Sequence, residues 1–139
     1  MPINQVQTAV QAFLTANWTA TPVAYQNDGF APSSDGNGSL VPWVYVEIYG
    51  GLYEQRSVGA GSAAANLWID QGQVWLHVFV GSGTGSQVAM SYGAQLAELF
   101  RGLFLAPNIQ FGDIALGPSG GTTDGNDWSL STSIDWMQG

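Results

Sequence analysis

The feature that most constrains the fold is a strict alternation of residue types over residues 73–80. Because successive side chains of a strand point to opposite faces of a sheet, this period of two predicts a strand with one face turned into a core. The aliphatic positions are Val74, Leu76, Val78 and Val80, and the alternate positions are Trp75, His77 and Phe79. Residues 43–49 alternate in the same way and are predicted as a second strand.

The rest of the chain supplies two predicted helices and further strands. Apolar residues recur at helical spacing over residues 3–17 and 86–104, and Pro107 ends the second helix. Short strands are predicted at 23–26, 53–58, 109–114 and 127–136, and Gln71-Gly72 predicts a hairpin turn between residues 66–70 and 73–80. This order predicts one domain, residues 1–139, of the α+β class, with a mostly antiparallel sheet and two helices packed on one face.

The charge balance excludes several classes of partner. Ten acidic residues stand against Arg56 and Arg101, which gives a net charge of −8. Two arginines cannot form the basic surface that grips phosphate backbones or anionic membranes, and no stretch is long and apolar enough to span a bilayer. Charged residues are only 9% of the chain, against about 25% in an average globular protein, and such thinly charged surfaces tend to associate.

No catalytic or metal-binding pattern emerges from the residues. The chain has no cysteine, and His77 is its only histidine, so neither a zinc site nor a cofactor is predicted. His77 lies in the middle of a predicted strand, and we interpret it as a half-buried strand histidine. The glycine-rich run at 81–85 lacks the lysine of a phosphate-binding loop, and the Asp-Gly steps at Asp35 and Asp124 are ordinary turn pairs. The chain is therefore predicted not to be an enzyme, and a hydrolase ranks last among the alternatives.

Aromatic residues make up 12% of the chain and include six tryptophans. Tryptophan and tyrosine are enriched at protein interfaces because they bury much area at a low entropic cost. The rival use of tryptophan on a sheet is a platform for sugars. A carbohydrate-binding module or small lectin therefore remains the alternative interpretation, and it predicts exposed, coplanar tryptophan rings.

The chain resembles the tail terminator-like (tail completion) proteins of long-tailed phages. The resemblance lies in the order and spacing of sequence pieces over most of the chain. These pieces are TPVAYQN at 21–27, PWVYVEI at 42–48, QRSVG at 55–59, GQVWLHVF at 72–79, GTG at 83–85, AQLAELFR at 94–101 and IQFG at 109–112. The usual basic residue in the linker after the glycine-rich stretch is missing, since residues 63–66 are uncharged.

The resemblance implies a structural protein of the virion that is assembled in the host cytoplasm. Its subunits would form a homohexameric ring at the head-proximal end of the tail, where the ring stops growth of the tail-tube protein and offers a docking face to the head-completion or neck protein. DNA would pass through the lumen without sequence-specific binding. The family carries no catalytic residues that could be transferred to this chain.

Three segments are the predicted contacts between subunits. They are the loop at 30–37, the segment at 50–61 and the loop at 117–126, and the candidate residues are Phe30, Asp35, Tyr53, Arg56 and Asp124. Arg56 is one of only two cations, so it is expected to bridge to an acid on a neighbouring subunit. The change Arg56→Ala is expected to weaken the ring without unfolding the monomer.

Overall fold

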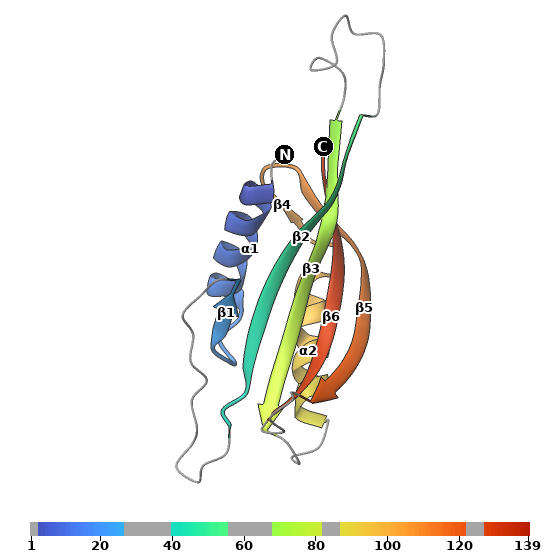
Figure 1. Cartoon of the computed structure of the whole chain (residues 1–139). Coiled ribbons are helices and arrows are strands. Elements are labelled where there is room, and N and C mark those ends of the chain that lie inside the picture. Colours follow the sequence, from blue (N-terminus) through green and yellow to red (C-terminus); the bar gives the residue numbers. More distant parts are fainter. Residues whose placement is uncertain (1–2, 27–39, 56–67, 82–86, 122–126) are drawn as a thin grey trace, which may run out of the picture.

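The computed structural model of the chain describes residues 3–26, 40–55, 68–81, 87–121 and 127–139. Two helices and six strands lie within these ranges (Figure 1). Their order is α1 (Ile3–Asn17), β1 (Val23–Tyr25), β2 (Trp43–Gln55), β3 (Trp68–Gly81), α2 (Gln87–Phe100), β4 (Phe104–Leu105), β5 (Ile109–Gly121) and β6 (Asp127–Gln138). No helix among these residues is both long and apolar enough to cross a membrane.

The strands form one six-stranded sheet in the order β1-β2-β3-β6-β5-β4. The short β1 pairs with β2 in parallel, and every other neighbouring pair is antiparallel. β2 and β3 pair along almost their whole length, and Figure 1 shows their paired ends rising beyond the helices. The sheet is therefore a central β2-β3-β6-β5 antiparallel unit with a short strand at each edge.

One face of the sheet is apolar and joins both helices in a single core. In α1, Val6, Val10 and Leu14 recur every four residues and are at most 1% exposed, which is the pattern of a helix that buries one stripe. The core also includes Ala89, Leu96 and Phe100 of α2. From the strands it takes Val44, Val46, Ile48, Val74, Leu76, Val78, Val80, Ile109, Phe111, Leu130, Ile134 and Trp136.

The predicted α+β class is wrong. Strands make up 55% of the described chain and helices 29%, so the chain is mostly β, with a mixed, curled sheet. The sequence prediction cut the strands too short, because it interpreted glycine pairs and glycine-rich stretches as breaks. In the structure β2 continues through Gly50 and Gly51 with a bulge, and β5 runs on to Gly121 into the predicted loop at 117–126.

The predicted hairpin turn at Gln71-Gly72 is also wrong, since β3 passes straight through both residues. Gly72 is needed for close packing instead of a turn. A Cβ atom at this position would lie 1.9 Å from the Tyr49 carbonyl oxygen and 2.6 Å from the Trp136 ring. Glycine in a strand interior often marks such a close approach of another group.

The second helix ends earlier than predicted. α2 stops at Phe100, and Gly102 follows with a φ of 66°. Glycine adopts this left-handed conformation without the penalty that a Cβ atom imposes, and it commonly ends helices in this way. Phe104, which was predicted to lie in the helix, belongs to β4 and is 61% exposed.

Candidate subunit interfaces

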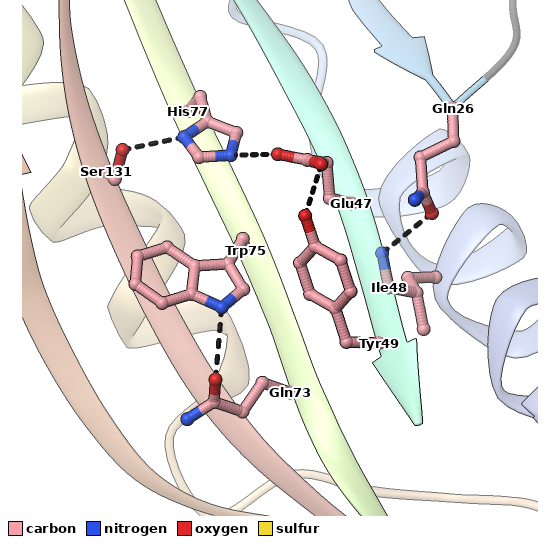
Figure 2. A network of polar contacts seen from close by, with 8 residues as sticks. All are labelled: Gln26, Glu47, Ile48, Tyr49, Gln73, Trp75, His77 and Ser131. Carbon is pink, nitrogen blue, oxygen red and sulfur yellow. Dashed lines mark hydrogen bonds and ion pairs between the residues drawn. The ribbon is translucent and has the colours of Figure 1, made fainter. Parts of the chain in front are cut away.

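The face of the sheet opposite the core carries aromatic and polar side chains, and we call it the open face. Figure 2 shows part of it, with the helices behind the sheet. Its residues alternate with the buried ones along β2, β3 and β6, and most are half-buried. They include Trp43, Tyr45, Glu47, Tyr49, Gln73, Trp75, His77, Phe79, Ser131, Ser133 and Asp135.

A polar network crosses three strands at the centre of the open face. His77 of β3 contacts Ser131 of β6 through Nδ1 at 2.6 Å, and Glu47 of β2 through Nε2 at 2.5 Å (Figure 2). His77 lies directly opposite both Ser131 and Tyr45 in the register, and Glu47 is two residues further along β2, opposite Trp75. The network therefore ties together strands that are far apart in the sequence.

Glu47 extends the network toward the edge of the sheet. The Tyr49 hydroxyl donates a hydrogen bond to the second oxygen of the Glu47 carboxylate. This bond, together with burial and the nearby negative charge, raises the pKa of Tyr49 above its ordinary value of 10.0. Tyr49 is 45% exposed, so the network reaches solvent at this end.

The order Ser131, His77, Glu47 has the connectivity of a nucleophile, a base and an orienting acid. The surroundings differ from those of an activated nucleophile. Ser131 lies in the middle of a strand and is 6% exposed, and the bulky Trp75 ring lies beside His77 at 6.0 Å between centroids. The arrangement fixes the orientation of side chains on the open face and holds the strands in register.

The second candidate surface is the β2–β3 arm, which we define as Leu52–Gln55 of β2 and Trp68–Asp70 of β3. It exposes Leu52 at 51% and Tyr53 at 40%. The Tyr53 ring stacks on Trp68 at 5.1 Å, so an aromatic pair joins the two strands of the arm. Leu52 and Tyr53 are consecutive, so they lie on opposite faces of the arm, and each face exposes one large side chain.

The third candidate surface is a groove of about 360 Å³ between α2 and β5, which we call the α2–β5 groove. Leu116 forms part of its wall and is 56% exposed, although its side chain lies against Gly93 of α2. The rim carries Glu98 and Arg101, which form an exposed ion pair at 3.5 Å. The remaining lining residues are Ala97 and Ile114.

Of the five predicted contact residues, Tyr53 lies in the described chain, in the arm. Phe30, Asp35, Arg56 and Asp124 lie outside the described residues. The sequence analysis did not identify the α2–β5 groove or the Glu47–His77–Ser131 network. The outward positions of the two alternating strands were the available signal for Glu47 and His77, but their pairing depends on a strand register that the sequence does not show.

The tryptophans do not form the platform that the sugar-binding alternative predicts. Trp18 and Trp136 are buried, and the other four are half-buried. Trp43 stacks on Phe79 at 4.5 Å with an interplanar angle of 11°, and Trp68 stacks on Tyr53, so each has one ring face covered by a neighbour. Within the described ranges, no three histidine, aspartate or glutamate side chains are grouped so as to hold a metal ion.

The described part of the chain is mostly β, and its exposed features suit contacts with other proteins. The family model of the phage tail terminator proteins matches residues 5–136, and the chain belongs to this family. The resemblance inferred from the sequence is thereby confirmed. The family is structural and belongs to the phage tail, in agreement with the prediction of a non-enzymatic protein.

A solved structure shares the fold. It is 20% identical in sequence, with a TM-score of 0.61, and the match covers 96% of this chain and 93% of the other. At this identity the likeness concerns the fold alone. No curated protein matches the sequence.

Proposed function

We propose that the chain forms a ring, a homohexamer, that caps the tail tube at the end next to the head. The ring stops further addition of tail-tube protein and presents a docking face to the head-completion or neck protein. The whole chain, residues 1–139, acts as one domain in this role.

The observation that carries this proposal is the exposure of large apolar side chains on a chain of the tail terminator family. A ring closes through heterologous contacts, in which one patch of a subunit meets a different patch on its neighbour. Such contacts need at least two separate apolar patches, and the arm and the α2–β5 groove provide them. The low share of charged residues, 9%, reduces the cost of burying these surfaces.

The open face is the surface best suited to line a lumen through which DNA passes. It carries Glu47 and Asp135, and the one arginine in the described ranges, Arg101, lies in the groove rim instead. Negative charge repels phosphates, so DNA can move past without being gripped. A ring structure with these acids on its outer wall would contradict this assignment.

The proposal is tested by measuring particle mass with light scattering over a range of concentrations, and by negative-stain imaging of the same samples. Closed rings of uniform size are expected, and their mass divided by 14.7 kDa gives the number of subunits. A protein that stays monomeric alone and also fails to form rings on added tail tubes would contradict the proposal.

A variant of Arg56, in the predicted contact segment at 50–61, separates an effect on ring assembly from an effect on folding. Arg56→Ala is expected to reduce ring formation while the unfolding transition of the monomer stays unchanged. Gln7→Ala, on the exposed side of α1, is the control and should alter neither quantity. If Arg56→Ala unfolds the monomer, Arg56 is an intrachain residue and not a contact between subunits.

A further inference from the structure

The two exposed apolar patches lie toward opposite edges of the same sheet. The arm belongs to β2, next to the edge strand β1, and the groove belongs to β5, next to the edge strand β4. Two like patches meeting each other would close a dimer and stop there. Two unlike patches on opposite flanks instead let each subunit bind one neighbour with its arm and the other with its groove.

The surfaces also match in chemistry. The arm offers an aliphatic side chain, Leu52, and an aromatic ring with a hydroxyl, Tyr53. The groove offers the exposed Leu116 with a guanidinium and a carboxylate at its rim. Arginine binds the faces of aromatic rings, and a carboxylate accepts a hydrogen bond from a tyrosine hydroxyl.

Direct addition of a neighbour's strand to β5 is disfavoured by the structure of that strand. Its pairing with β6 is interrupted by register shifts between Phe111 and Ile114 and between Leu116 and Ser119. Pro118 lies in the second of these and has no N–H to donate. Bulges and proline are the usual protections of an edge strand against strand addition, so the flank is suited to side-chain docking instead.

We infer that the β2–β3 arm of one subunit docks into the α2–β5 groove of a second copy of this chain. The Leu52 face of the arm lies against Leu116 on the β5 wall, and the Tyr53 face lies beside Arg101 at the end of α2. This inference rests on the proposed ring and names the two patches that meet in it. Arg101 then lies against a neighbour of net charge −8, where a cation reduces the repulsion between acidic subunits.

The absence of cysteine from the sequence allows a direct test by disulfide trapping. Leu52→Cys and Leu116→Cys are introduced together, and the protein is mildly oxidised at a concentration at which the wild type forms rings. A ladder of covalent multimers that ends at the ring's subunit number is expected, because a disulfide needs Cα atoms within about 7 Å. Each single variant alone should give no ladder, and an equal mixture of the two should stop at the dimer.

A second pair of variants tests the same contact without cysteine, because a cysteine substitution could itself weaken docking. Leu116→Asp is expected to lower ring formation at least tenfold at a fixed concentration. Val88→Asp places the same charge on an exposed residue in the first turn of α2, outside the groove lining, and should leave the rings intact.

The outcomes separate this inference from the proposed function. Intact rings with neither a ladder nor an effect of Leu116→Asp would overturn the docking of arm into groove and leave the ring itself standing. A wild-type protein that forms no ring, alone or on tail tubes, would overturn the proposed function and the docking together.

Discussion

The two faces of the sheet are made by alternate residues of the same strands, yet they differ in almost every physical respect. On β3, Val74, Leu76 and Val78 are 0% exposed beneath the helices, while Trp75 and His77 between them are half-buried. Trp75 donates a hydrogen bond to the side chain of Gln73, and His77 contacts Ser131. The inner face stabilises the fold through packing, and the open face keeps polar and aromatic groups available. In a chain of 139 residues, this division leaves one side of the sheet free for contacts outside the domain.

The largest expected difference between the faces is in the free energy of unfolding. Leu76→Ala should destabilise the monomer by about 2–5 kcal/mol, because it leaves a cavity in a core that cannot collapse fully. Ser133→Ala, on the open face of β6, should cost at most about 0.5 kcal/mol. Chemical denaturation of both variants measures the contrast, and equal losses would show that the open face is packed as tightly as the core.

The inner face should be intolerant of even one added methyl group. Gly72→Ala places a Cβ atom against the Tyr49 carbonyl and the Trp136 ring, and it should cost about 1–3 kcal/mol or more. Gly51→Ala is the matched control in the partner strand, where the nearest atom to a Cβ lies at an ordinary 3.5 Å. Thermal unfolding compares the two, and a Gly72→Ala protein as stable as the control would mean that the strands can shift apart at no cost.

The network on the open face should contribute less than the core but more than a simple surface contact. His77→Ala removes both contacts of the ring and should cost about 1 kcal/mol, since Ser131 and Glu47 each lose a partner. His77→Gln can keep one of these bonds and should lose less. If His77→Ala unfolds at the same denaturant concentration as the wild type, the network orients side chains without stabilising the sheet.

Asp70 is the exception on the inner side, because it is an acid that is 0% exposed. Burial raises the pKa of its carboxyl above the ordinary value of 3.8. As the pH rises through 3.8, Asp70 ionises in the unfolded chain before it does so in the folded one, so the free energy of unfolding decreases. The decrease ends once the pH passes the pKa of Asp70 in the folded chain, and the lost stability is not regained at neutral pH.

Asp70→Asn removes this loss, and the variant should be more stable than the wild type at pH 7. The gain should shrink and disappear as the pH falls below about 3.8, where both states carry the proton. Unfolding free energies measured from pH 3 to pH 7 test the sign. If the gain in the free energy of unfolding is constant over this range, the ionisation of Asp70 is not its cause.

Local sequence patterns predicted the two faces but not the lengths of the strands. Alternation placed Val74 and Leu76 inward and Trp75 and His77 outward, because the period of two is a property of any strand. The predicted ends of the strands were wrong because glycine occurs in turns but also inside strands, where it allows close packing. Gly72 admits the Trp136 ring and Gly50 pairs with Gly72 inside β2, next to the bulge, and only the neighbouring strands reveal this.

The candidate contacts could be predicted only in part for a related reason. Tyr53 was accessible from the sequence as a large residue in a polar segment. The α2–β5 groove brings Leu116 beside Gly93, and the network joins Glu47, His77 and Ser131. Both depend on which strands and helices become neighbours, and that information lies in long-range packing and not in any single stretch of the chain.

The bulge at Gly51 has a consequence for how the chain can change in length. Upstream of it, odd-numbered residues of β2 such as Tyr49 share a face with Gln73, whereas downstream the odd-numbered Tyr53 pairs with the buried Asp70. The bulge thus acts as a phase shift in the alternation. Removing Gly51 would leave every side chain of the strand on its present face, while removing any other residue from the paired part of β2 would exchange the two faces beyond that point. Along β2, Gly51 is therefore the position at which a deletion can be absorbed without rebuilding the arm.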